Sequence, residues 1–240
     1  MARILVTGAT QGLGRLTAEE LLADGHHVVA HGRGAGRLDD LAARGADVVL
    51  GDLADPGLTR EVAEQVNRLG PVDAVIHNAG VMTGATILPV NVVAPYLLTA
   101  LVGPPGRLVY LSSGMHRGGR AELAGLDWSG ARPTGSYSDS KLLVTTLAAA
   151  VARRWARVFS NAVDPGWVPT RMGGAGAPDD LREGAMTQVW LATSDDPEAR
   201  TSGGYWHHRR HADRHPAAAD REFQDRLLDA LAGHTGVPLP

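Results

Sequence analysis

The sequence contains no cysteine, so it forms no disulfide and offers neither a thiolate nucleophile nor a cysteine-ligated zinc. It has no apolar stretch near the roughly 18 residues that span a bilayer, and MARILVTGAT reaches Gly8 too soon for a signal-peptide core. The net charge of −3 comes from both signs interspersed, which argues against a surface that coats nucleic acid. We therefore expect a cytoplasmic protein with neither a membrane nor a nucleic-acid partner.

Short apolar runs alternate with longer segments of helical periodicity. The candidate strands are almost continuously hydrophobic, as parallel strands covered on both faces are, and they span 2–8, 27–32, 46–52, 73–80, 107–113 and 157–166. The candidate helices span 13–24, 57–69, 92–102 and 137–155. Residues 114–136 resemble a long polar loop, and further on lie helices at 179–193 and 217–231 and a short strand at 203–206. The alternation predicts a single doubly wound α/β domain over 1–240, with a mostly parallel seven-stranded sheet and helices on both faces.

The first predicted strand runs directly into a glycine-rich turn, TGATQGLG (7–14), and a helix follows. Ligands of doubly wound sheets bind outside the carboxyl ends of the strands, where this turn lies. Glycines let the backbone approach a pyrophosphate, and a helix N-terminus offers free N–H groups. The spacing is GxxxGxG rather than GxGxxG, and the turn lacks the lysine of a P-loop. The context favours a dinucleotide site; the alternative is a plain tight turn.

The end of the second predicted strand bears on the choice of dinucleotide. An acidic residue at this point bonds a free ribose 2′-hydroxyl, whereas an arginine accommodates a 2′-phosphate. The sequence has Gly32-Arg33 there, and Arg15 would add positive charge on the same side. NADPH is therefore favoured over NADH. The alternative is that Arg33 and Arg37 are solvated loop charges.

Tyr137 and Lys141 lie four residues apart at the head of a predicted helix, in YSDSK, and so share a helix face. An unperturbed tyrosine has a pKa of about 10, which is high for proton transfer near neutrality. A neighbouring ammonium group favours the phenolate and lowers that pKa, so Lys141 is expected to tune Tyr137. The alternative for Tyr137 alone is a half-buried tyrosine at a helix start.

Several short motifs follow one another along the chain: TGATQGLG (7–14), GDL (51–53), HNAG (77–80), Asn91, LSS (111–113), YSDSK (137–141) and PGWVPT (165–170). Their order resembles the short-chain dehydrogenase/reductase family. SSGMH (112–116) and SGGYW (202–206) resemble its retinol-dehydrogenase-like and WW-domain-oxidoreductase-like branch. The resemblance implies a Rossmann-type fold in which residues 1–170 form the cofactor and catalytic core. Residues 171–240 would then supply a substrate-side loop and C-terminal elements.

The family resemblance also implies a reaction, namely hydride transfer between NADPH and a ketone or aldehyde, or the reverse, with no metal. The catalytic residues that it implies are Asn91, Ser113, Tyr137 and Lys141. The cofactor-binding residues are Tyr137 and Lys141 again, with Gly8, Thr10, Gln11, Gly12, Leu13, Gly14, Arg33, Asp52, Leu53, Asn78, Ala79, Gly80, Pro165, Gly166, Val168 and Thr170. Tyr137 would act as general acid or base, and Ser113 would hold the substrate oxygen beside it. Asn91 would position a water that links Lys141 to solvent.

The sequence departs from the family pattern in three places. His77 replaces the usual asparagine of HNAG, which we expect to change packing more than chemistry. The stretch from Asn78 to Asn91 is short, so we expect no helical turn before Asn91 and a shortened version of the helix that usually pairs subunits in a homo-oligomer. The long interval between Ser113 and Tyr137 makes 116–134 a candidate lid or substrate loop.

Three further predictions concern the substrate, a histidine cluster and a competing function. Trp167, Met172, Met115 and Trp206 are candidates for an apolar pocket, which favours an apolar carbonyl or alcohol substrate. The cluster formed by His207, His208, His211 and His215 is interpreted as a solvated surface segment rather than a metal site. The alternative to an enzyme is a catalytically idle, NADP-binding regulatory or interaction protein on the same fold.

Overall fold

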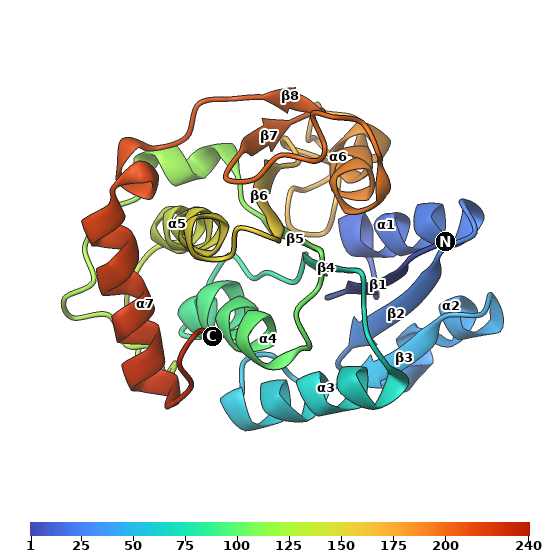
Figure 1. Cartoon of the computed structure of the whole chain (residues 1–240), viewed down its shortest axis with the longest axis horizontal. Coiled ribbons are helices and arrows are strands. Elements are labelled where there is room, and N and C mark those ends of the chain that lie inside the picture. Colours follow the sequence, from blue (N-terminus) through green and yellow to red (C-terminus); the bar gives the residue numbers. More distant parts are fainter.

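The computed structural model describes residues 1–240, apart from the side chain of Ala35, and its strands form one eight-stranded sheet (Figure 1). The sheet order is β3-β2-β1-β4-β5-β6-β7-β8. Neighbours up to β7 are parallel, and β8 pairs antiparallel with β7. The strands are β1 (Arg3–Val6), β2 (His27–Gly32), β3 (Asp47–Leu50), β4 (Ala74–His77), β5 (Arg107–Leu111), β6 (Phe159–Asp164), β7 (Tyr205–His207) and β8 (Arg210–His211).

The predicted doubly wound α/β domain is therefore confirmed, with one strand more than expected. The seven predicted strands are the parallel ones. The eighth arises because the chain turns back after β7 through His208 and Arg209, both at positive φ, and pairs β8 with the edge. A two-residue strand leaves no periodic signal in a sequence, so only the tertiary pairing reveals it.

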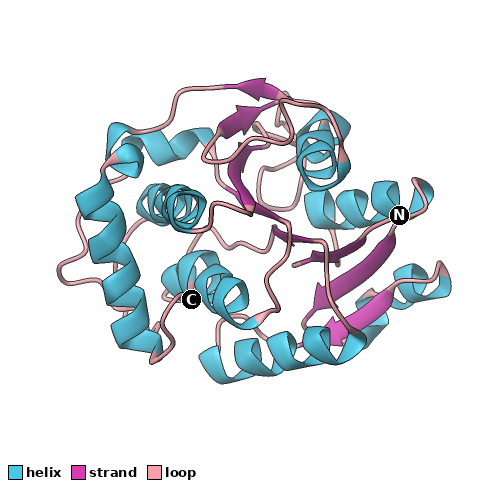
Figure 2. Cartoon of the chain, viewed as in Figure 1, coloured by secondary structure: helices cyan, strands magenta, loops and turns pink.

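Helices cover both faces of the sheet (Figure 2). They are α1 (Gly12–Ala23), α2 (Asp39–Ala43), α3 (Pro56–Leu69), α4 (Ala94–Leu101), α5 (Tyr137–Arg154), α6 (Leu181–Thr193) and α7 (Arg221–Thr235). One apolar core lies under α1, α2 and α6, and the other lies under α3, α4 and α5. Successive strand residues alternate between them, since Leu5 faces the second core while Ile4 and Val6 face the first. This is why the strands are hydrophobic without alternation.

The helix α5 begins at Tyr137 because the residue before it forms a capping box. The Ser136 hydroxyl accepts from the Asp139 N–H at 3.1 Å, and the Asp139 carboxylate accepts from the Ser136 N–H at 2.8 Å. Two of the free N–H groups at the helix start are thereby satisfied. The cap fixes the first turn of α5, and with it the position of Tyr137.

The C-terminal segment packs over the helices on one face of the sheet (Figure 1). Helix α7 lies along the outer side of α5, where Leu227 and Leu231 join the same core as Leu147. The tail that follows bonds to both neighbouring helices: Tyr96 Oη donates to the Val237 carbonyl at 2.7 Å, and Trp155 Nε1 donates to that of Pro240 at 2.6 Å. As a result α5 is buried on its outer side as well as against the sheet.

The chain before Asn91 differs from expectation. A helical turn begins at Ile87 and continues as a π-helix over Pro89–Val93, which leads into α4. The prediction that no helical turn precedes Asn91 is therefore wrong. The wider π turn fits Asn91 into the short stretch after β4, as π segments often do next to functional sites.

The loop predicted over 114–136 contains one short helix, η3 (Gly114–Gly118), and is otherwise irregular. Arg120 ties it to α5 through hydrogen bonds to Asp139 of 2.8 and 3.1 Å, and Leu126 and Trp128 pack against the core. No residue of 116–134 lines the large cavity described below. The apolar side chains of this loop pack on the fold, and its role as a lid or substrate loop stays a prediction.

His77 is 2% exposed at the end of β4, and its role is packing, as expected. Its ring stacks on Tyr110 with centroids 4.6 Å apart, and Nε2 lies 3.2 Å from the Thr99 hydroxyl. Burial lowers the pKa of His77 to about 3. Burial also lowers the pKa values of His31 and His116.

These buried histidines predict acid sensitivity. The unfolded chain binds more protons than the folded one between about pH 3 and 6.5, so stability is lost as the pH falls through this range. His77 alone should account for about 2 kcal/mol between pH 7 and 5. Thermal unfolding followed across this range should give a smaller fall in Tm for His77→Asn than for the parent. In the exposed His27→Asn variant, Tm should fall with pH as steeply as in the parent. If Tm fell equally steeply in all three proteins, His77 would not be a source of the acid sensitivity.

Candidate active site

A cavity of about 1010 Å³ opens at the carboxyl ends of the parallel strands, where the strand order reverses between β1 and β4. Ser113 lines it, and Asn91 does not. It is also lined by every residue predicted to bind the cofactor: Gly8, Thr10, Gln11, Gly12, Leu13, Gly14, Arg33, Asp52, Leu53, Asn78, Ala79, Gly80, Tyr137, Lys141, Pro165, Gly166, Val168 and Thr170. The fold thus brings residues from across the chain to one hollow.

The glycine loop is held from beneath by the segment after β4. Asn78 Nδ2 donates to the Thr7 carbonyl at 2.8 Å, and the Ala79 N–H donates to the Thr7 hydroxyl at 3.0 Å. A Cβ on Gly14 would lie 2.2 Å from Asn78 Nδ2 and 2.5 Å from the Gly8 carbonyl oxygen, so only glycine fits. The first turn of α1 carries no acidic residue. Its free N–H groups and its dipole therefore suit an anionic group.

His31 is a buried residue of this region that sequence reasoning missed. Its Nδ1 accepts from the Gly8 N–H at 3.2 Å, and its Nε2 lies 3.0 Å from the Gly51 carbonyl. Because a backbone N–H can only donate and a carbonyl can only accept, the ring must be neutral with its proton on Nε2. His31 therefore braces the glycine loop against the end of β3. A polar residue inside the apolar run HVVAHG was the available signal.

The two arginines considered for the 2′-phosphate differ in position. Arg33 lines the cavity, is 74% exposed and lies 3.9 Å from Asp52 Oδ2. Arg15 does not line it; its guanidinium pairs with Glu19 at 2.6 Å and lies 3.4 Å from Asp40, in the segment that follows β2. That Arg15 adds charge on the same side as Arg33 stays a prediction.

Tyr137, Lys141 and Ser113 meet at the other end of the cavity. Lys141 Nζ is buried, donates to the Leu111 carbonyl at 2.6 Å and lies 5.4 Å from the centroid of the Tyr137 ring. Of the adjacent serines, Ser112 turns toward α5, with its hydroxyl 2.6 Å from that of Thr145. Ser113 caps η3. Tyr137 and Lys141, four residues apart in the sequence, are therefore also neighbours in space.

Burial dominates the electrostatics of this pair. It raises the pKa of Tyr137 to about 12; a hydrogen bond with the Ser113 hydroxyl acts in the opposite sense, and the Asp164 charge raises the value further. Burial lowers the pKa of Lys141 to about 8. The expectation that the pKa of Tyr137 lies below its usual value is not met, because desolvation of the phenol is the largest effect and raises it.

Asn91 supports the cavity from behind its wall. Its side chain exchanges two hydrogen bonds with the backbone of Val81, of 2.8 and 2.9 Å, and also donates to the Ser140 hydroxyl at 2.9 Å. Asn91 Oδ1 and Lys141 Nζ flank Gly80, each within 3.6 Å of where its Cβ would be. That Asn91 positions a water beside Lys141 stays a prediction.

The substrate end of the cavity is rich in exposed apolar groups. Met82, Met115, Trp167 and Met172 line it and are between 40 and 60% exposed. Trp206, also predicted for this pocket, is instead 4% exposed in the core, where its ring packs edge-on against Trp190. Its place on β7 turns it away from the cavity.

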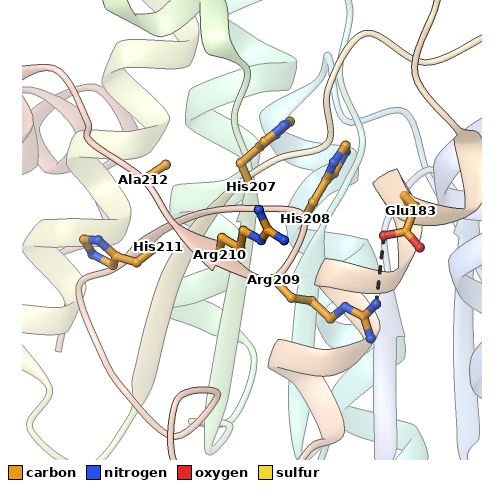
Figure 3. Close-up of a pocket in the computed structure, with 7 residues that line it drawn as sticks. All are labelled: Glu183, His207, His208, Arg209, Arg210, His211 and Ala212. Carbon is orange, nitrogen blue, oxygen red and sulfur yellow. Dashed lines mark ion pairs between the residues drawn. The ribbon is translucent and has the colours of Figure 1, made fainter.

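The histidine-rich hairpin of β7 and β8 lines a second hollow of about 750 Å³ with Glu183 (Figure 3). Arg209 pairs with Glu183 at 3.9 Å. Among the described residues no group of histidine and acidic side chains is arranged to hold a metal ion. The interpretation as a solvated surface segment fits the exposed His211 and also His207, whose side chain is 41% exposed although it lines both hollows.

Comparison with known proteins agrees with this arrangement. The family model described as short chain dehydrogenase matches residues 2–180. Over all of this chain and 99% of its own length, short-chain dehydrogenase chry4 of Gibberella zeae is 34% identical. Polyprenol dehydrogenase of Mus musculus is 31% identical over 93% of this chain and 80% of its own length. A crystal structure of a protein from Mycobacterium paratuberculosis, 26% identical, superposes with a TM-score of 0.83 over 100% of this chain and 95% of its own.

The chain therefore belongs to the short-chain dehydrogenase/reductase family and is an oxidoreductase of that family. Within the described residues, no helix combines the length and apolar character that crossing a membrane requires.

Proposed function

We propose that the chain is an NADPH-dependent oxidoreductase that reduces a ketone or aldehyde to an alcohol, or catalyses the reverse, with Tyr137 as general acid or base. The observation that carries the proposal is that Ser113, Tyr137 and Lys141 lie in the same cavity as the glycine loop. Loss of NADPH absorbance in the presence of a panel of apolar ketones and aldehydes tests it. Tight NADPH binding without turnover of any member would instead favour an idle, NADP-binding regulatory protein.

The protein's own groups supply the proton side of the reaction. When bound, the reduced nicotinamide supplies a hydride, with its electron pair, to the carbonyl carbon. Tyr137, with a pKa of about 12, holds its proton at neutral pH and donates it to the carbonyl oxygen. Ser113 bonds that oxygen, and the ammonium group of Lys141 faces the phenolate that forms.

The cofactor is held by the residues that line the loop end of the cavity. The glycine loop and the start of α1 would receive the pyrophosphate, and Asp52 and Leu53, which line the same cavity, would border the adenine. The segment from Pro165 to Thr170 lies over the glycine loop, since a Cβ on Gly12 would be 3.1 Å from Thr170 Cγ2. Arg33 receives the 2′-phosphate.

The role of Arg33 predicts a change of cofactor preference. Arg33→Ser should weaken NADPH binding about tenfold or more while leaving NADH binding within about twofold, because only NADPH carries the phosphate charge. Dissociation constants for both cofactors, from quenching of tryptophan fluorescence, measure the effect. Arg37→Ser, on the same loop outside the cavity, is the matched control. An equal loss of affinity for NADPH and NADH would mean that Arg33 does not bind the 2′-phosphate.

The exposed apolar side chains at the mouth favour an apolar substrate. Met82, Met115, Trp167 and Met172 leave apolar surface facing the cavity, which a ligand of similar character would cover. The name of the polyprenol dehydrogenase among its relatives is consistent with this polarity.

A further inference from the structure

Asp164 places a carboxylate at the reacting end of the cavity, where the mechanism above does not use it. It is the last residue of β6, is 8% exposed and lines the cavity with Ser113 and Tyr137. A Cβ on Gly114 would lie 3.1 Å from Asp164 Oδ2, so this oxygen sits beside the residue that follows Ser113. Its charge is close enough to contribute to the raised pKa of Tyr137.

The hydrogen bonds of Asp164 leave one carboxylate oxygen for a ligand. Oδ1 accepts from the Gly166 N–H at 3.1 Å. His207 Nδ1 lies 3.2 Å from the Asp164 backbone carbonyl, which can only accept, so the ring proton points there. The same nitrogen is 3.8 Å from Oδ2, beyond hydrogen-bond distance. No described residue forms a hydrogen bond to Oδ2 by distance and angle, and the buried Tyr205 hydroxyl, which has no other partner, lies near the carboxylate.

The nearby cations do not neutralise this carboxylate. Arg117 donates to the Asp213 carbonyl at 2.8 Å and lies over the Tyr205 ring, and no arginine or lysine of the described chain pairs with Asp164 within 4.0 Å. Two other carboxylates line the cavity: Asp52, which lies 3.9 Å from Arg33, and Asp179, whose Oδ2 accepts from the Trp167 N–H at 2.6 Å. Oδ2 of Asp164 is therefore an acceptor within an otherwise largely apolar substrate end.

We propose that Asp164 is a specificity-determining residue that accepts a hydrogen bond from a substrate hydroxyl next to the reacting carbonyl. The substrate class is then a neutral, otherwise apolar hydroxy ketone or hydroxy aldehyde. Its carbonyl lies against the Ser113 and Tyr137 hydroxyls, which donate, while its hydroxyl lies against Asp164, which accepts. An anionic group at the same position is rejected by the carboxylate charge. This inference rests on the proposed function.

A matched pair of substrates tests the inference. In the methyl ether of 2-hydroxyacetophenone, a methyl group replaces the hydroxyl hydrogen through which the substrate would donate a hydrogen bond to Asp164. The wild-type chain should favour the hydroxy ketone in kcat/KM by about 10- to 100-fold, the range expected for a hydrogen bond to a charged group. In Asp164→Asn, which keeps an oxygen for the Gly166 N–H, the preference should fall to below about threefold. Asp179→Asn removes another carboxylate that lines the cavity and should keep the wild-type preference.

The possible outcomes separate this inference from the function on which it rests. Turnover of neither ketone, nor of any other carbonyl compound, contradicts the proposed function itself. Turnover of both ketones at similar kcat/KM, or an unchanged preference in Asp164→Asn, overturns the role of Asp164 alone. If Asp179→Asn lowers the preference for the hydroxy ketone as much as Asp164→Asn does, the role of Asp164 is also overturned. The preference would then depend on the total negative charge of the cavity. NADPH affinity, measured for each variant, verifies that the variant is folded.

Discussion

Replacing Tyr137 by phenylalanine is expected to lower kcat for carbonyl reduction by about 10²- to 10⁴-fold, the usual contribution of a positioned general acid. The substitution removes only the hydroxyl, and the ring stays packed beside Lys141. NADPH affinity and Tm should therefore remain close to those of the parent. Steady-state rates with saturating NADPH, measured beside cofactor binding, separate loss of chemistry from loss of the site.

A second tyrosine provides the control for this change. Tyr96 is fully buried, and its hydroxyl bonds the Val237 carbonyl far from the cavity. Tyr96→Phe should cost about 1 kcal/mol of stability and leave kcat unchanged. If Tyr137→Phe kept more than about a tenth of the parent rate, proton donation by Tyr137 would be ruled out.

Replacing Gly14 by alanine is expected to destroy the cofactor site. The added methyl group would lie 2.5 Å from the backbone oxygen of Gly8, so either the glycine loop or α1 has to move. Such overpacking costs about 1 to 3 kcal/mol, and here the displaced atoms belong to the loop that receives the pyrophosphate. We expect NADPH binding to weaken at least tenfold and Tm to fall, as measured by fluorescence titration and thermal melting.

Another helical glycine makes a matched comparison. Gly233 lies in α7 with open space where its Cβ would be. Gly233→Ala should raise stability by about 0.5 to 1 kcal/mol, since alanine is the better helix former, and should not alter NADPH binding. Equal NADPH affinities for the two alanine variants would contradict the assignment of the glycine loop.

Much of the candidate site was predictable because it follows strand ends. In a parallel sheet the carboxyl ends of all strands meet at one edge, so the motifs after β1, β2, β4, β5 and β6 had to converge once those strands were recognised. That is why Gly8, Arg33, Asn78, Ser113 and Pro165 all line one cavity. The helical spacing of Tyr137 and Lys141 likewise fixed their shared face.

Other features depended on what each side chain meets after folding. Trp206 packs in the core and the loop after Ser113 bonds to α5, and neither contact follows from the local periodicity of the sequence. The role of His31 in holding the glycine loop became visible only in the folded chain, where the residue after β3 lies beside its ring. The pKa of Tyr137 was predicted with the wrong sign because burial was unknown.

The sequence by itself determined the order of the seven parallel strands and the family, and it predicted the residues proposed to carry the chemistry, because these rest on composition and spacing along the chain. Only the tertiary structure decided the charge balance at Tyr137, the supporting position of Asn91 and the exposure of the Asp164 carboxylate to the cavity. Desolvation and hydrogen-bond partners come from segments distant in sequence. Their energies therefore exist only once the chain has folded around the site.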